Sequence, residues 1–185
     1  VLECKENDLS ALNIKKCPVL WILRAENNRM KELIVDESPR LTLVEAANNQ
    51  LMWLDMSNVE KDVSTEDATF KVDNQTPYVQ AVKISPTETG LLVHSRFDVS
   101  RVLNLRAKGL SQTPRETTVD GIRYFVFYDD GPDTPNLVGS DCGYVYETKW
   151  PYPWGDENSK DNNLPVTLKV TSWTKHQAFL TLSQN

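Results

Sequence analysis

Strict alternation of residue type in one segment most constrains the fold of this chain. In residues 122–128, Ile122, Tyr124, Val126 and Tyr128 share one parity, and Phe125 and Phe127 lie between them. A strand with apolar residues on both faces is covered on both sides of a sheet. The segment therefore predicts a central strand, and the domain around it is expected to be built on a sheet.

Three further segments of the C-terminal third alternate in the same way, at residues 143–150, 165–173 and 178–182. They are rich in Val, Thr, Tyr and Trp, which are typical of strands. The Asp-, Gly- and Pro-rich residues 129–136 predict a surface connection, and residues 174–177 are short enough to close a hairpin. We therefore predict an antiparallel meander in this third.

The N-terminal third allows two interpretations. Residues 24–37 and 44–57 each place an Asn-Asn pair between apolar stretches, about 21 residues apart. Asparagine tolerates the left-handed conformation of tight turns, so each pair is consistent with a strand–turn–strand hairpin. The alternative is a helix over residues 40–55, with Ser38 as its cap and Pro39 at its first position. Two copies of a pattern do not establish a repeat architecture.

A short helix is predicted in the middle of the chain, where Asp98 or Ser100 is a cap and Val99, Val102 and Leu103 recur at helical spacing. Residues 60–67 and 111–120 are polar and predict linkers within the domain. The expected fold class is mainly β, an antiparallel β-sandwich with one or two short helices. With 185 residues, we expect a single domain over residues 1–185, with an N-terminal arm at 1–18 and the sandwich at 19–185.

Charge and hydropathy exclude some partners. The net charge is −6, the pI is near 5.0, and no run of basic residues is longer than Lys15-Lys16. A polyanion such as nucleic acid would be repelled by such a surface, so we expect no nucleic-acid partner. The longest apolar run, residues 19–23, is far short of a membrane span and is interpreted as a buried strand.

The three cysteines are consistent with either an oxidising or a reducing compartment. Cys4 and Cys17 bracket a short polar segment, and a disulfide between them would fix the N-terminal arm. That interpretation favours a secreted or periplasmic protein. The alternative is three structural thiols in a cytoplasmic protein.

The sequence contains no standard motif for binding a nucleotide cofactor or a metal ion. No G-x-G arrangement is present, so no nucleotide-binding loop of the usual form is expected, and we expect no cofactor. His94 and His176 are too few and too far apart for a standard zinc site, and we expect no metal. Cys142, in Gly139–Gly143, is interpreted as a structural thiol. The oxygen-bearing residues Asp156, Asn158, Asp161 and Asn162 depart from the spacing of a calcium loop.

The aromatic segment of residues 149–163 is the candidate ligand-binding site. Trp150, Tyr152 and Trp154 alternate with Pro151 and Pro153. Such rings dominate binding hot spots, so the three aromatic residues are candidate ligand-binding residues. The alternative is that the tryptophans plug one end of the sandwich, while the prolines fix the path of the connection.

Three functions remain open from the sequence. The first is a non-catalytic module that recognises or assembles with another protein. The second is a carbohydrate-binding module that uses Trp150, Tyr152 and Trp154. The third is a hydrolase whose site includes carboxylates or His94, although no catalytic residues can be located.

Overall fold

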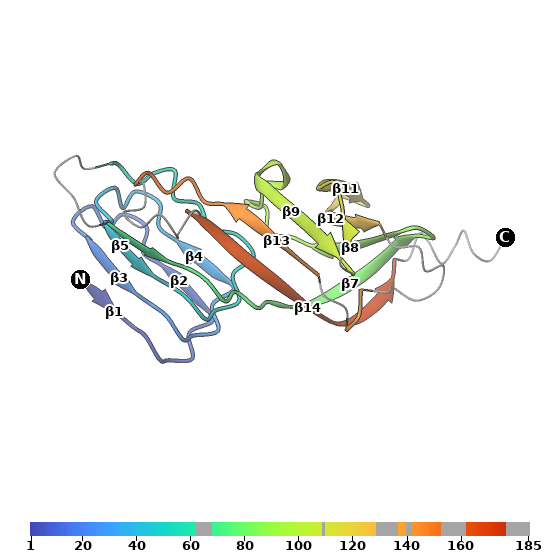
Figure 1. Ribbon diagram of the computed structural model, residues 1–185, viewed down its shortest axis with the longest axis horizontal. Coiled ribbons are helices and arrows are strands. Elements are labelled where there is room, and N and C mark those ends of the chain that lie inside the picture. Colours follow the sequence, from blue (N-terminus) through green and yellow to red (C-terminus); the bar gives the residue numbers. More distant parts are fainter. Residues whose placement is uncertain (62–67, 109, 129–136, 140–141, 153–161, 177–185) are drawn as a thin grey trace. The chain divides into compact units, whose positions relative to one another are not determined.

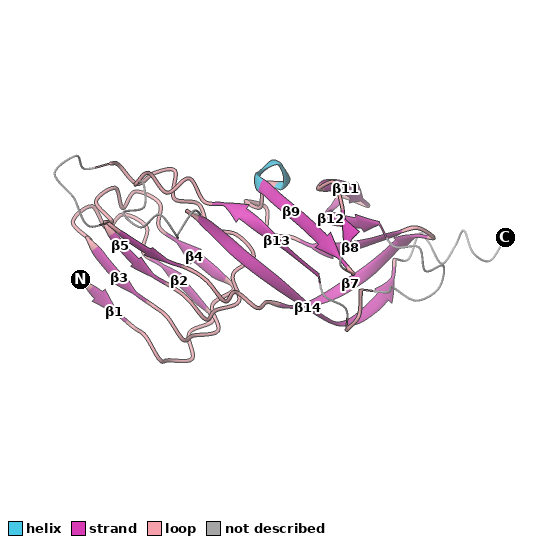
Figure 2. Cartoon of the chain, in the orientation of Figure 1, coloured by secondary structure: helices cyan, strands magenta, loops and turns pink. Residues whose placement is uncertain are grey.

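The computed structural model describes residues 1–61, 68–108, 110–128, 137–139, 142–152 and 162–176 (Figure 1). Among these residues the only helical segment is the single 3-10 turn η1 (Val99–Arg101), and the other regular elements are strands (Figure 2). The predicted mainly β class is confirmed. The chain divides into two compact units, of which unit 1 is Val1–Pro77 with Val145–Val166 and unit 2 is Tyr78–Tyr144 with Thr167–Asn185.

Unit 1 is a parallel β-solenoid. Strands β1 (Leu2–Glu3), β3 (Ile22–Arg24), β5 (Leu43–Glu45) and β6 (Thr69–Lys71) pair in parallel, in that order. Strands β2 (Ala11–Asn13) and β4 (Glu32–Ile34) form a second parallel pair. Because each strand lies beside its equivalent from the previous coil, the chain winds as a stack of repeats. The step is 21 residues twice, and then 26 residues from Glu45 to Lys71.

The core of the solenoid consists of columns of equivalent side chains. In the second and third coils the buried positions follow the spacing L-x-x-L-x-L-x-x-N-x-L, which is typical of leucine-rich repeats. Alanine at the third apolar position leaves room for the amide that follows it. The residues at these positions are Leu20, Leu23, Ala25, Asn28 and Met30 in the second coil, and Leu41, Val44, Ala46, Asn49 and Leu51 in the third.

Buried amides connect the coils, and we call Asn28, Asn49 and Gln75 the amide ladder. Asn49 Oδ1 accepts from the backbone N–H of Met30 at 3.0 Å, and its Nδ2 donates to three backbone carbonyls, those of Ala25, Ala46 and Ala47, at 3.0 to 3.2 Å. Buried backbone groups need such partners wherever the turn of a coil leaves them unpaired. The amide ladder therefore satisfies the polar groups inside an otherwise apolar stack.

Gln75 continues the amide ladder in the fourth coil. Its Oε1 accepts from Leu51 N at 3.0 Å, and its Nε2 donates to the carbonyls of Ala46 and Val72 at 2.9 Å. Asn28 makes the equivalent bonds two coils earlier: it accepts from Leu9 N and donates to Cys4 O. Glutamine thus replaces asparagine without loss of the pattern.

The Asn-Asn pairs mark corners of the coils. Asn27 and Asn48 adopt φ of 58° and 56°, which is the left-handed conformation expected of them. The strand after the first corner, β4, pairs with β2 and not with β3, and no described strand lies between the second corner and β6, so the predicted hairpins are wrong. The alternative helix over residues 40–55 is also wrong, because Leu43–Glu45 is strand β5.

Residues 1–18 belong to the solenoid. Leu2 lies opposite Leu23, and Leu12 lies opposite Leu33. The first coil thus continues the stack of the second, instead of forming a separate arm.

Residues of unit 2 form most of a curled sheet with both parallel and antiparallel strand pairs. Its order is β10-β9-β13-β14-β7-β8-β12-β11. The side chain of Gln112, the residue after β10, binds the backbone of Tyr128, the last residue of β12. It donates to Tyr128 O and accepts from Tyr128 N, both at 3.0 Å. Because the sheet curls and the strands of unit 1 are parallel, a sandwich of two antiparallel sheets is not confirmed. The bounds are β7 (Tyr78–Ser85), β8 (Glu88–Leu92), β9 (Val102–Ala107), β10 (Leu110–Ser111), β11 (Arg115–Val119), β12 (Ile122–Tyr128), β13 (Cys142–Glu147) and β14 (Asn163–Lys175).

The central strand predicted from alternation is confirmed. Strand β12 pairs with β8 on one side and β11 on the other, and its residues Tyr124 to Phe127 are buried. Phe125 packs against Phe97, Phe127 and Tyr144, with ring centroids 4.8 to 5.6 Å apart. The predicted strands at 143–150 and 165–173 correspond to β13 and β14, both with alternating burial.

The predicted helix after Asp98 is wrong beyond its first turn. Asp98 is the N-cap of the 3-10 turn η1, because its Oδ1 accepts from Ser100 N at 3.0 Å. The chain then enters strand β9. Asn104, at φ 50°, interrupts the alternation within β9, so that Val102 and Leu105 are both buried. This three-residue spacing imitates a helix.

Residues 115–119, predicted as part of a linker, form the edge strand β11. The predicted connection 129–136 and the predicted strand 178–182 lie outside the described residues.

Candidate functional site

The aromatic segment predicted as a ligand site is buried. Trp150 is 6% exposed and Tyr152 is 3% exposed, whereas Trp154 lies outside the described residues. The ring of Trp150 stacks on Phe70 of the last coil, with centroids 4.8 Å apart, and contacts Tyr152 at 5.2 Å. Neither ring offers the free face that sugar stacking requires.

Hydrogen bonds hold this segment against the last coil of the solenoid. The hydroxyl of Tyr152 donates to Glu60 O at 3.1 Å, and Met56 N donates to Thr148 O at 2.7 Å. Val166, at the start of β14, forms a parallel bridge with Gln75 of the amide ladder. A solenoid needs a distinct terminal cap over its last apolar coil. Trp150 and Tyr152 provide part of that cap in unit 1.

The disulfide predicted between Cys4 and Cys17 is wrong. Both are free thiols, because they belong to different sides of the first coil. Cys4 N donates to Arg24 O beside β3, whereas Cys17 N donates to Ser38 Oγ at 3.3 Å in a later turn. A disulfide requires Cα atoms within about 7 Å.

Cys142 has the environment of a structural thiol. It is buried at the start of β13, and this burial raises the pKa of its thiol to about 12. At pH 8 only about one thiol in ten thousand is then ionised, so the reactive thiolate is nearly absent. Ser140 and Asp141, its neighbours in the sequence, lie outside the described residues.

The two histidines do not assemble a catalytic or metal site within the part of the chain that the structure describes. His94 is exposed, and its Nδ1 accepts from Arg96 N at 3.1 Å. His176 lies 3.7 Å from a carboxylate oxygen of Asp120, and its ring meets Tyr124 edge-on. The described residues contain no group of three His, Cys, Asp or Glu side chains suited to a metal. Of the four oxygen-bearing residues after the aromatic segment, Asp156, Asn158 and Asp161 lie outside the described residues, and Nδ2 of Asn162 donates to Tyr152 O at 2.7 Å.

No helix within the described residues has the length and apolar character needed to cross a membrane.

The outer face of the solenoid sheet carries a line of alternating charge. Glu3, Arg24, Glu45 and Lys71 occupy equivalent positions on β1, β3, β5 and β6. Each is ion-paired with its neighbour, including Arg24 to Glu45 at 3.1 Å and Lys71 to Glu45 at 2.9 Å. Hydrogen bonds from Lys71 and then Arg24 hold the pKa of Glu45 below its usual value. Cross-strand pairs of this kind help fix the register of the coils.

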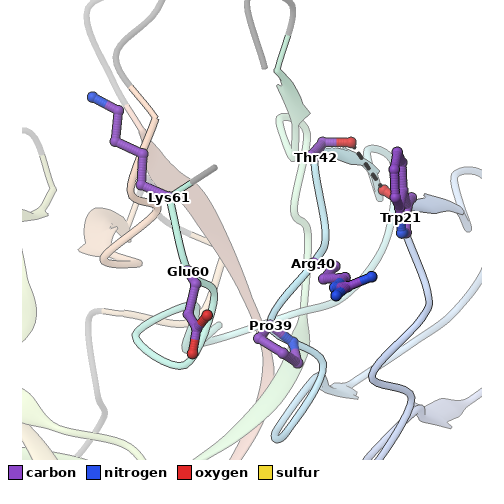
Figure 3. Close-up of a pocket in the computed structure, with 6 residues that line it drawn as sticks. All are labelled: Trp21, Pro39, Arg40, Thr42, Glu60 and Lys61. Atoms are coloured by element: carbon purple, nitrogen blue, oxygen red, sulfur yellow. Dashed lines mark hydrogen bonds between the residues drawn. The ribbon is translucent and has the colours of Figure 1, made fainter. Parts of the chain in front are cut away.

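A pocket of about 340 Å³ lies beside Trp21, at the start of β3 (Figure 3). We call it the Trp21 pocket. The Trp21 side chain is 54% exposed. The loops that enter the strands supply the other lining residues, and the full lining is Trp21, Pro39, Arg40, Thr42, Glu60 and Lys61.

Trp21 is held firmly although its ring is exposed. Its carbonyl accepts from Thr42 N at 2.9 Å, from Leu43 N at 3.1 Å and from Thr42 Oγ1 at 3.3 Å. The next residue, Ile22, pairs with Leu43 in β5. The backbone below the ring is therefore rigid, and an exposed ring on a rigid support loses little entropy on binding.

Sequence reasoning missed Trp21 because residues 19–23 look like one buried strand. Only Leu20 and Leu23 of this run are buried, and Val19 is the most exposed. The repeat contains the signal that was needed: at a step of 21 residues, Leu20 and Leu23 align with the apolar Leu41 and Val44, whereas Trp21 aligns with the polar Thr42.

Comparison of the chain with protein-family models, with curated proteins and with solved structures finds no match. In the second and third coils, the spacing of the buried residues resembles that of leucine-rich repeats.

Proposed function

We propose that this chain is a non-catalytic recognition module that binds another protein through the outer face of the solenoid, with Trp21 as the anchor. The observation that carries the proposal is an exposed tryptophan immediately before strand β3, with its backbone held by three hydrogen bonds, beside a pocket lined by further loop residues. Tryptophan and arginine are the residues most enriched among binding hot spots, and Trp21 and Arg40 both line this pocket.

The mixed character of the outer face also supports a protein partner. Ile22 and Leu43 form an apolar row, half buried, directly beside the charged row of Arg24 and Glu45. Protein interfaces combine an apolar centre with a polar rim. A stack of coils presents such rows on a regular, extended surface.

The other two functions have less support. The buried rings of Trp150 and Tyr152 count against a carbohydrate-binding module, and the described histidines and Cys142 provide no assembled hydrolytic site. Export stays a prediction, and it has lost the support of a disulfide because Cys4 and Cys17 are free thiols.

Selection of binders from a displayed library of random peptides tests the proposal without a known partner. We expect enriched peptides to bind the outer face, so that Trp21→Ala weakens their binding at least tenfold in a titration. The loss of one well-packed anchor has an effect of this size.

Tyr78→Ala is the matched control, because Tyr78 is a 59% exposed aromatic residue of unit 2. It is expected to leave the affinity unchanged within about twofold. A library that yields no enriched peptide, or only peptides insensitive to Trp21→Ala, would contradict the proposal.

A further inference from the structure

We infer that the segment recognised at the Trp21 pocket is acidic: an extended peptide that places a carboxylate on Arg40 and an apolar side chain against Trp21. This inference rests on the proposed function and names the chemistry of the partner at the same site.

The described residues that line the pocket and the cavity next to it carry a small excess of positive charge, although the whole chain is acidic. A second cavity, of about 580 Å³, shares Pro39 and Glu60 with the Trp21 pocket. Together the two cavities are lined by three cations and two acids, of which Glu37 is already paired with Lys15 at 3.4 Å. The whole chain has a net charge of −6. The charged lining residues are Lys16, Arg40 and Lys61 against Glu37 and Glu60.

Repetition of the coils produces this cluster. Lys16 and Glu37 are 21 residues apart and both adopt a left-handed turn conformation, at φ 62° and 57°. Arg40 and Lys61 are also 21 residues apart. Glu60 N donates to Pro39 O at 2.9 Å, so the step of 21 residues still holds for these loops, although it is 26 residues between β5 and β6. Arg40 and Lys61 follow these two residues and line the same pocket.

Arg40 is available for a carboxylate. It is exposed, and neither Arg40 nor Lys61 forms an ion pair with any residue that the structure describes. In Figure 3 the Arg40 side chain extends to the side on which Trp21 lies, whereas Glu60 is on the opposite side of the pocket and Lys61 points away. A guanidinium presents a planar fork of donors that matches a carboxylate in two parallel hydrogen bonds.

The apolar surface next to Arg40 can bind an apolar side chain of the peptide. Trp21 and Pro39 form the apolar part of the lining, and each comes from a different coil. An acid next to an aromatic or aliphatic residue fits both features at once. Attraction of the acid to the local positive charge would also speed association and make it depend on salt.

The test uses the full chain and the peptides enriched on it. Peptides that depend on Trp21 are expected to contain Asp or Glu beside an apolar residue. Arg40→Glu should lower their affinity at least tenfold, whereas Arg29→Glu, which makes the same change in net charge at an exposed pair with Asp8, should change it less than about twofold.

A double-mutant cycle assigns the contact. Replacing the acid of the peptide by its amide should weaken binding to the wild-type chain but cause little further loss on the Arg40→Glu variant. Peptides that need Trp21 yet lack an acid and are unaffected by Arg40→Glu would overturn this inference and leave the proposed function intact. Peptides insensitive to Trp21→Ala would overturn both.

Discussion

Replacement of Asn49 with alanine is expected to lower the free energy of unfolding of the solenoid by about 3–5 kcal/mol. Asn49 is 3% exposed and makes four hydrogen bonds to backbone groups of its own coil and the previous one. Alanine leaves the buried N–H of Met30 without its partner and removes one of the two donors to each of the carbonyls of Ala25, Ala46 and Ala47. Each of the four lost hydrogen bonds contributes about 1 kcal/mol. Urea unfolding followed by tryptophan fluorescence measures the change.

Asn58→Ala is the control for that measurement. Asn58 is an exposed residue in the loop before the last coil, so its replacement is expected to change stability by less than about 0.5 kcal/mol. Equal midpoints for the two variants would mean that the amide ladder does not hold the coils together.

Trp150→Ala is expected to destabilise the chain by about 3–5 kcal/mol, as is usual for removal of a large buried aromatic side chain. The change removes the stack on Phe70 and exposes the last coil of the solenoid. Unfolding in urea, followed by circular dichroism in the β-sheet region, detects the loss.

The same measurement on Trp21→Ala separates the two tryptophans. Trp21 is half exposed, so its loss is expected to cost less than about 1 kcal/mol. A stable Trp150→Ala variant would show that Trp150 is not part of a cap, and would restore it as a candidate ligand-binding residue.

The strands of unit 2 were largely predictable because their alternation is local. Ile122–Tyr128 was predicted at its observed bounds, and the alternating burial of β13 and β14 follows from their residue pattern. The helix after Asp98 was wrong, since the left-handed Asn104 changes the spacing of buried residues within β9. The antiparallel meander predicted for the C-terminal third was also wrong, because β12 pairs with β8 and β11, and β14 pairs in parallel with β7.

The solenoid was not predictable from the same rules. Its strands are three residues long or shorter, too short for alternation to appear, and their partners lie 21 or 26 residues away. The longer last step and the change from Asn49 to Gln75 hid the fourth coil, so only two copies of the pattern were visible. Recognition of the amide ladder requires knowing that equivalent residues stack.

The exposed position of Trp21 was missed for the same reason. Composition drew attention to Trp150 and Tyr152, where tryptophan, tyrosine and proline are dense, but density does not distinguish a cap from a binding surface. Trp21 is surrounded by apolar neighbours and looks like core. Its exposure follows only from its position in the coil.

Hydrogen exchange of the chain with and without an enriched peptide tests most directly the claim that the solenoid is the recognition surface. The account predicts added protection in residues 16–24, 37–45 and 58–61, where the loops and strands around Trp21 lie. Protection confined to residues 78–128 of unit 2, with no change around Trp21, would contradict it.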